Sequence, residues 1–249
     1  MNYRTLALAA ILGASALPAS AAGNYCGIPT GLEWDYRTAT PQMMRILEGR
    51  HFTDDVELGV KSTSGSMNDI GADFDYTLKL VPNHARALNS VLRLASRYSN
   101  GVLPGSKQPI ECYFERAVRI YPDDGVTWFM YARYQFLKGK DQQARSMLEK
   151  ALEKSPEDPA INYNMGLVLA KLKKYDEALP YAQKAYALNF PMPALKQMLL
   201  KAGKWVEPPP LPAEGEAEPA AAAAAASAAS TESAAPAAKP ADPAPSTKP

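Results

Sequence analysis

The fold of this protein is decided by two consecutive stretches of equal length that resemble each other. The first, residues 125–158, reads GVTWFMYARYQFLKGKDQQARSMLEKALEKSPED, and the second, residues 159–192, reads PAINYNMGLVLAKLKKYDEALPYAQKAYALNFPM. Each stretch holds two amphipathic helical patterns, which in the second cover residues 160–172 and 175–188. A repeated pair of helices predicts hairpins that stack side by side and share a core. Small residues recur at matching positions: Ala132 aligns with Gly166, Ala144 with Ala178, and Ala151 with Ala185.

The residue types at these positions follow from the way helices pack. Two antiparallel helices joined by a short turn need small residues where they cross and bulky apolar residues between the layers. Pro156 ends the second helix of the first stretch, because proline lacks an N–H and clashes with the preceding turn. The pattern resembles the tetratricopeptide repeat, which implies an all-α fold of the α-α superhelix type. The resemblance is most specific in the second stretch, at Asn162, Met165, Gly166, Leu169, Tyr175, Ala178, Ala185 and Leu188.

The same period continues towards the N-terminus. A second helix is predicted at 110–120, and the first helix of that unit at 85–98, with a longer connection between them than is usual in the family. Stacked repeats expose an apolar end, so a closing helix is expected after the last unit. The clear units are 85–124, 125–158 and 159–192, followed by the closing helix at 193–204.

A more degenerate unit precedes these three. Its second helix is predicted at 70–80, where the apolar pattern matches that of the equivalent helix at 110–120. Its first helix is predicted at 41–48, with Thr40 as the N-cap and proline in the first helical position. The resemblance therefore covers residues 67–204, and residues 22–66 are expected to form an irregular N-terminal segment.

Residues 1–21 have the pattern of a secretory signal peptide. Arg4 supplies a positive start, residues 6–17 are apolar, and Ala19-Ser20-Ala21 offers small residues for cleavage. The alternatives are an uncleaved membrane anchor and a lipid anchor on Cys26, although the residues before this cysteine match a lipobox poorly. We expect an exported bacterial protein that is located in the periplasm.

Residues 205–249 are expected to form a disordered tail. From residue 208 onward, Ala and Pro make up most of the sequence, so almost no bulky apolar side chain is present to form a core. Such a tail would serve as a spacer or as a weak contact with the cell wall or another envelope component, or it would be solvated without a binding role.

Composition and motifs exclude several classes of function. Lys and Arg number 27 against 26 Asp and Glu, and residues 22–207 carry a net charge of +3, which does not favour nucleic acid. The two histidines, His51 and His84, lack metal-ligand spacing, and the chain has no glycine-rich phosphate loop or nucleophile motif. We therefore expect no catalytic residue, no metal and no small-molecule cofactor, and we interpret His84 as a helix cap.

Cys26 and Cys112 are the two cysteines of the chain, and in an oxidising compartment we expect them to form a disulfide. Closing the long loop between them would stabilise the fold by roughly 4 kcal/mol in the chain-entropy model. One alternative is a pair of buried thiols. Another is a reactive thiol at Cys112, which follows Glu111 near the start of a predicted helix, where its pKa would be lowered.

The resemblance also implies a binding groove, because in this family the first helix of each unit lines a concave surface. The arginines at these positions suit a carboxylate, and the aromatic residues suit apolar anchors of a partner. The clamp with which some relatives bind a free C-terminal carboxylate is not expected, because its Lys/Asn pairs are incomplete here. The groove positions are Arg86, Asn89, Arg93, Ser96 and Arg97, then Val126, Phe129, Arg133, Phe136 and Leu137, then Ala160, Tyr163, Leu167, Ala170 and Lys171.

The function expected from the resemblance is that of a non-catalytic adaptor, which binds a protein or peptide partner in the bacterial cell envelope. Two alternatives stay open at this point. One is an envelope enzyme or thiol-redox protein that uses Cys112 and Glu111, and the other is a structural module that tethers the tail.

Overall fold

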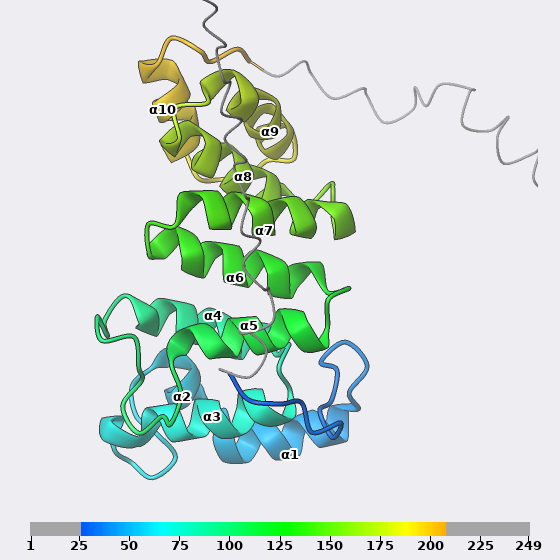
Figure 1. Ribbon diagram of the computed structural model, residues 1–249, viewed down its shortest axis with the longest axis vertical. Coiled ribbons are helices and arrows are strands. Elements are labelled where there is room, and N and C mark those ends of the chain that lie inside the picture. Colours follow the sequence, from blue (N-terminus) through cyan, green and yellow to red (C-terminus); the bar gives the residue numbers. More distant parts are fainter. Residues whose placement is uncertain (1–25, 208–249) are drawn as a thin grey trace, which may run out of the picture. The chain divides into compact units, whose positions relative to one another are not determined.

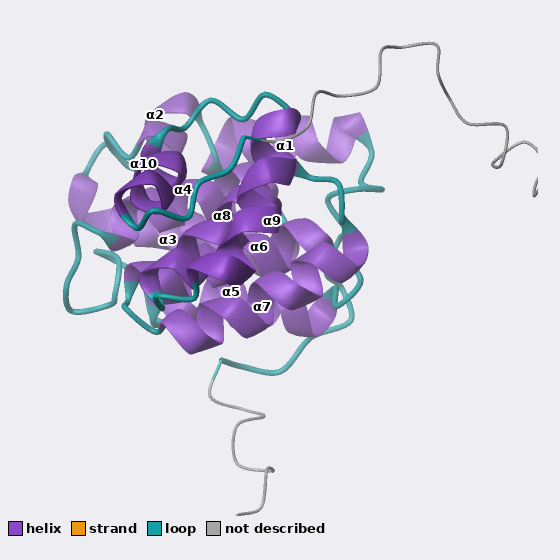
Figure 2. Ribbon diagram, turned by 90° about the horizontal axis from the view of Figure 1, so that it is seen from above, coloured by secondary structure: helices purple, strands orange, loops and turns teal. Residues whose placement is uncertain are grey.

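The computed structural model describes residues 26–207, so the expected signal peptide and most of the expected tail lie outside the described residues. Within this range the chain forms α-helices, one short 3-10 helix and no β-strand (Figures 1 and 2). The expected all-α fold is therefore confirmed. None of the helices in this range is both long enough and apolar enough to cross a membrane.

Three helical hairpins follow one another in the order of the sequence (Figure 1). The first helices are neighbours, because α6 contacts both α4 and α8, and α10 closes the series by contacting α8 and α9. This is the arrangement of an α-α superhelix. The helices of this series for which bounds are predicted, α4, α5, α8, α9 and α10, each lie within one turn of those bounds. The hairpins are α4 (Ala85–Ala95) with α5 (Ile110–Ile120), α6 (Gly125–Leu137) with α7 (Asp141–Lys154), and α8 (Pro159–Lys171) with α9 (Tyr175–Ala187), followed by α10 (Ala194–Lys201).

The first helix of each hairpin begins where the sequence provides a cap. Asp124 accepts a hydrogen bond of 2.9 Å from the N–H of Val126, and Asp158 is in the same position in the next hairpin, where it caps α8. His84 caps α4 as expected, because its Nδ1 accepts a bond of 3.3 Å from the N–H of Ala87. These side chains satisfy N–H groups that have no partner within the first turn of a helix.

The last two hairpins turn through a left-handed residue at the same position of the repeat. Gly139, between α6 and α7, has a φ of 73°, and Lys173, between α8 and α9, has a φ of 61°. Glycine adopts this conformation without strain, whereas lysine carries a Cβ that disfavours it. The turn between α8 and α9 therefore has the same left-handed conformation as the turn between α6 and α7, although lysine stands in place of glycine.

Small residues lie where the helices cross. Ala144 and Ala178 are fully buried near the starts of α7 and α9. A Cβ placed on Gly166 would lie 2.6 Å from Cδ2 of Leu195 and 3.3 Å from the carbonyl oxygen of Ala178. Gly166 thus lets α8 approach both α9 and α10, as the repeat pattern predicts.

Residues 22–66 are not irregular throughout, which corrects the expectation for this segment. They contain α1 (Pro41–His51) and α2 (Asp54–Leu58). Thr40 caps α1 as expected, since its Oγ1 accepts a bond of 3.3 Å from the N–H of Met43, and α1 packs against α3 (Ile70–Leu80) as the degenerate hairpin. Sequence periodicity does not predict α2 or the 3-10 helix at Met67–Asp69, because one turn carries too few apolar positions to show a period.

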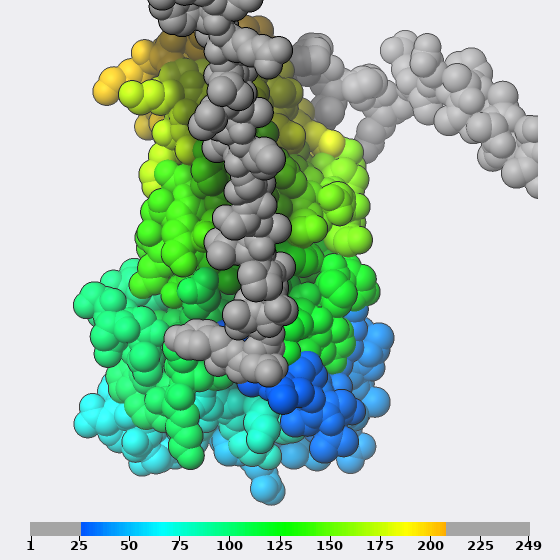
Figure 3. Space-filling model, viewed as in Figure 1, coloured from blue at the N-terminus to red at the C-terminus, as the bar shows by residue number. Residues whose placement is uncertain are grey.

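Residues 26–40 precede these helices and form an N-terminal strap without helical structure, which lies on the surface of the cyan and green segments (Figure 3). A disulfide joins Cys26 to Cys112 of α5, with the two Cα atoms 5.0 Å apart. The N–H of Trp34 donates a hydrogen bond of 2.7 Å to the carbonyl oxygen of Leu80, at the end of α3. The strap is thus attached to the second helices of two successive hairpins.

The buried amide of Asn83 holds the far end of the strap. Its Nδ2 donates hydrogen bonds of 2.8 Å to Asp35 and 2.9 Å to Asp124, and its Oδ1 accepts one of 2.8 Å from the N–H of Tyr36. Hydrogen bonds from Arg37 lower the pKa of Asp35 to about 2. One side chain therefore joins the strap, the turn between α3 and α4, and the cap of α6.

The packed part of the chain continues past α10 to the end of the described residues. The ring of Trp205 lies 5.5 Å from that of Tyr186, and Nε2 of Gln183 donates a hydrogen bond of 3.0 Å to the carbonyl oxygen of Val206. Residues 205–207 therefore belong to the packed part, although the sequence assigns them to the tail.

Candidate partner-binding pocket

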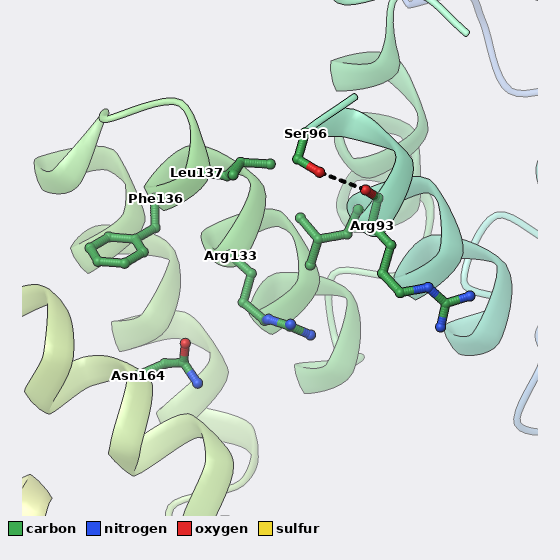
Figure 4. A pocket seen from close by; sticks show the side chains of 7 residues that line it. Arg93, Ser96, Arg133, Phe136, Leu137 and Asn164 are labelled. Carbon is green, nitrogen blue, oxygen red and sulfur yellow. Dashed lines mark hydrogen bonds between the residues drawn. The ribbon is translucent and has the colours of Figure 1, made fainter. Parts of the chain in front are cut away.

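A pocket of about 320 Å³ opens between the first helices of three consecutive hairpins (Figure 4). Its walls come from α4, α6 and α8, the helices that the resemblance places on the concave surface. Arg93, Arg133 and Phe136 are predicted site residues, so the structure brings these three together. The lining residues are Leu92, Arg93, Ser96, Arg133, Phe136, Leu137 and Asn164.

Arg133 provides a positive charge within this pocket. Its Nη1 donates a hydrogen bond of 3.2 Å to Oδ1 of Asn89, and its guanidinium lies 5.6 Å from the centre of the Phe129 ring. Burial lowers the pKa of Arg133, and no described carboxylate offsets this effect. A guanidinium has five N–H donors, so most of its donors remain for an anionic group that enters the pocket.

The wall beside Arg133 is apolar. Leu137 is 45% exposed, Phe136 is half-buried and Leu92 is buried beneath them. Lys171 supports Phe136, because its Nζ lies 4.5 Å from the ring centre and donates a hydrogen bond of 2.8 Å to Asp141. Lys171 is a predicted site residue, but it acts on the pocket through Phe136 and does not line it.

Arg93 lines the pocket, but its guanidinium is bound within the chain. Its Nη2 donates hydrogen bonds to the carbonyl oxygen of Glu57 at 2.5 Å and to Oγ of Ser90 at 3.1 Å. Figure 4 shows its guanidinium directed away from Arg133. Arg97, another predicted site residue, is exposed but is not among the residues that line the pocket.

Arg86 is bound within the chain, which corrects its predicted role as a groove residue. It donates hydrogen bonds to Glu57 of α2 and to Glu48 of α1, and it lies 5.4 Å from the centre of the Phe52 ring. The hydrogen bond from Arg86 lowers the pKa of Glu57, and the pKa of Arg86 is raised in turn. The charge that the sequence assigns to a partner is instead used to attach α4 to the N-terminal helices.

Phe129 and Tyr163 are core residues, which corrects their predicted role as groove residues that contact apolar anchors of a partner. Phe129 is 9% exposed and Tyr163 is 5% exposed. Tyr163 packs against Phe190, with 4.6 Å between the ring centres, because the chain after α9 folds back over α8. Asn89, also a predicted site residue, serves the pocket by orienting Arg133.

Sequence reasoning missed the acidic residues that neutralise Arg86 and the apolar floor at Leu92. Glu48 lies at the end of the predicted helix of the degenerate unit, and Glu57 lies in a segment without a repeat pattern. The repeat period does not indicate that either residue contacts α4. The apolar period of α4 predicts that Leu92 is buried. It does not show that Leu92 also lines a pocket at the edge of this buried face.

The cysteines and Glu111 do not form an open thiol site. Cys112 is fully buried and bonded to Cys26. The carboxylate of Glu111 accepts hydrogen bonds from Tyr131 at 3.0 Å and from Gln135 at 2.7 Å. Within residues 26–207, no group of three or more His, Cys, Asp or Glu side chains is placed to hold a metal ion.

A family model described as tetratricopeptide repeat matches residues 135–185, which run from the last turn of α6 through α7 and α8 to α9. A search of curated proteins returns no match. Tetratricopeptide repeats bind protein partners and are typically non-catalytic. The matched residues include Phe136 and Asn164 of the pocket, and the match begins two residues after Arg133. The chain therefore contains tetratricopeptide repeats, which the family model matches over residues 135–185.

Proposed function

We propose that this protein is an exported, non-catalytic adaptor that binds an acidic segment of a protein partner in the pocket between α4, α6 and α8. The proposal rests on the environment of Arg133, which is half-buried. Its guanidinium contacts the amide of Asn89 and the ring of Phe129 but forms no ion pair with a described residue. Buried charges in proteins are normally paired, so this one favours an anionic ligand.

The pocket favours a partner segment that presents a carboxylate beside an apolar side chain. The carboxylate would accept a bidentate pair of hydrogen bonds from Arg133, which is geometrically specific. The apolar side chain would cover Phe136 and the exposed part of Leu137. Asn164 uses its Nδ2 in a bond to the carbonyl oxygen of Ala160, so its Oδ1 remains as an acceptor for an N–H of the partner.

The periplasm is the location that we propose for this interaction. The pattern of residues 1–21 supports export, and a disulfide between Cys26 and Cys112 is typical of an oxidising compartment. The tail from residue 208 onward would then be available as a spacer or an envelope contact, in addition to the adaptor role.

Site-specific photocrosslinking in cells tests the proposal. A photoreactive residue at Leu137, on the rim of the pocket, should form an adduct with a partner protein, whereas one at Glu153 on α7 should not. Arg133→Gln should reduce the adduct about tenfold or more, because hydrogen bonds to a charged group contribute about 1.5–3 kcal/mol. Arg45→Gln is the matched control, since Arg45 is exposed on α1, outside the pocket.

Three outcomes would contradict parts of the proposal. An adduct at position 137 that survives Arg133→Gln would show that the charge is not used. An adduct that requires residues 208–249 would favour a tether for the tail over an adaptor. The thiol-redox alternative would be restored if the purified protein had thiol-redox activity and Cys112→Ser abolished it.

A further inference from the structure

A second pocket, of about 260 Å³, lies beneath the N-terminal strap and is separate from the pocket between the first helices. The strap covers one side of it, α3 and α5 provide the other, and the disulfide of Cys26 lies at its edge. Two of its lining residues are basic and none is acidic. The lining residues are Cys26, Gly27, Ile28, Thr30, Lys79, Gln108 and Arg116.

Arg116 is an unusual side chain for such a covered position. The residue is 8% exposed, and its guanidinium makes no hydrogen bond to any other described residue, with Nε fully shielded from solvent and without a partner. Burial lowers the pKa of Arg116. Buried polar groups are nearly always hydrogen-bonded, and a guanidinium carries five donors.

Glu33 is the nearest carboxylate, but it is already used by its own turn. Its Oε1 lies 3.8 Å from Nη2 of Arg116, which is too long for a hydrogen bond. Its two oxygens accept bonds from the N–H of Thr30 at 2.7 Å and from the N–H of Gly31 at 2.8 Å. Glu33 therefore lowers the cost of burying the charge of Arg116 without satisfying its donors.

The other charged groups around Arg116 do not satisfy it either. Arg119, one turn later, is paired with Glu115 at 2.8 Å and donates to the carbonyl oxygen of Gly27 at 2.7 Å. Asp75 accepts bonds from Tyr113 and Gln108 on the same side of the molecule. Lys79 is exposed and lines the pocket, so it adds a second cation without a neutralising partner among its lining residues.

From these contacts we infer that the pocket beneath the strap is a binding site for a small oxyanion, either a carboxylate or a phosphate group. Arg116 supplies several N–H donors in a fixed plane, and Lys79 supplies a mobile ammonium at the entrance. Carboxylate and phosphate both present a pair of acceptor oxygens that a guanidinium binds bidentately. The site is independent of the proposed adaptor function, because it lies on the second helices.

Thermal unfolding of the full-length protein, with its disulfide intact, tests this inference. The melting temperature is measured in inorganic phosphate and in acetate, each against sodium chloride of the same ionic strength. At a concentration ten times the dissociation constant, the favoured anion should raise Tm by about 3–6 °C. A rise in phosphate alone or in acetate alone identifies the anion, and either supports the site.

Arg116→Met should remove this rise, and Lys150→Met provides a matched control. Lys150 occupies the position of α7 that is equivalent to Arg116 in α5, and it is exposed. The Nε–Hε signal of Arg116 in ¹⁵N NMR gives a second measurement on the unchanged protein, and this signal should shift with the same anion. The inference is overturned if neither anion raises Tm or moves this signal beyond chloride, or if Arg116→Met keeps the full rise.

Discussion

The Nε of Arg86 donates a hydrogen bond of 3.0 Å to Oε1 of Glu57, and this contact joins α4 to α2. The charge of Arg86, which the repeat pattern assigns to the groove, is thus used within the chain. Arg133 is then the arginine whose guanidinium is available in the pocket. Both arginines are at predicted groove positions of successive first helices, where Arg86 corresponds to Val126 and Arg133 corresponds to Arg93. Their different roles follow from Glu48 of α1 and Glu57 of α2, which pair with Arg86 of α4 but form no described pair with Arg133 of α6.

Arg86→Gln should therefore leave partner binding unchanged. Arg86 is 44% exposed in its side chain, so its pairs are screened by solvent and the free energy of unfolding should fall by no more than about 1 kcal/mol. Crosslinking from position 137 and urea unfolding measure the two effects. A loss of the adduct comparable with that of Arg133→Gln would show that Arg86 binds the partner after all.

Phe129→Ala should destabilise the protein and is therefore a poor test of binding. Phe129 is 9% exposed and packs in the core with the helices of the last two hairpins. Removing a buried phenylalanine lowers the free energy of unfolding by about 3–5 kcal/mol. Urea unfolding measures the loss of stability in Phe129→Ala and in Phe136→Ala. Because the Phe136 side chain is half-buried, its removal should lower the free energy of unfolding by less. Equal stability of both variants would show that Phe129 is not a core residue.

His84 should make stability depend on pH. Burial, and then the charge of Arg86, lower the pKa of His84 to about 4, and the charge of Glu57 in α2 opposes this shift. Nε2 of His84 also lies 3.1 Å from Oε1 of Glu48 in α1. In the unfolded chain the pKa is about 6.5, so the unfolded state binds more protons between these values. Stability is complete above pH 6.5 and falls towards pH 4, by at most about 3 kcal/mol.

The variant His84→Asn isolates this effect, because asparagine also caps helices but does not titrate. Urea unfolding at several pH values should show a weaker decline for the variant than for the original protein between pH 6.5 and 4. Parallel curves for the two proteins would mean that carboxylates, and not His84, cause the decline.

Gly71→Ala should destabilise the contact between α3 and the connection that precedes α5. The N–H of Gly71 donates to the carbonyl oxygen of Pro104 at 2.7 Å, and a Cβ would lie 2.6 Å from that oxygen and from the backbone nitrogen of Ser106. Backbone atoms cannot rotate away, so we expect a loss of about 1–3 kcal/mol or more. Gly49→Ala in α1 is the control, because a Cβ there meets no atom within 4 Å and should stabilise the helix by about 0.5–1 kcal/mol. The prediction would be contradicted if Gly71→Ala and Gly49→Ala shifted the urea midpoint in the same direction.

Removing the disulfide should destabilise the fold. The double variant Cys26→Ser, Cys112→Ser should lose about 2–5 kcal/mol in the free energy of unfolding, because the unfolded chain is no longer constrained across 86 residues. A reducing agent should lower Tm of the original protein by a similar amount and leave the variant unchanged. Two alkylatable thiols in the untreated protein would indicate that the bond is not formed.

The repeated hairpins could be predicted because their signals are local. The bounds of α5, the capping role of His84 and Thr40, and the small residue at Gly166 all follow from periodicity and from the chemistry of helix ends. The pocket was predicted only in part. Arg93, Arg133 and Phe136 line it, but the choice among equivalent positions depends on neighbours far away in the sequence.

The repeated two-helix pattern in the amino-acid sequence is enough to specify paired helices, because each hairpin has to bury its apolar face against the next. Which arginines remain for ligands depends on contacts between segments that are far apart in the sequence. Glu57 approaches Arg86 across 29 residues, and the strap brings Glu33 to an ion-pair distance of 3.8 Å from Arg116 without a hydrogen bond between them. Such pairings depend on where irregular segments lie in space, and no short-range pattern of residue types encodes that position.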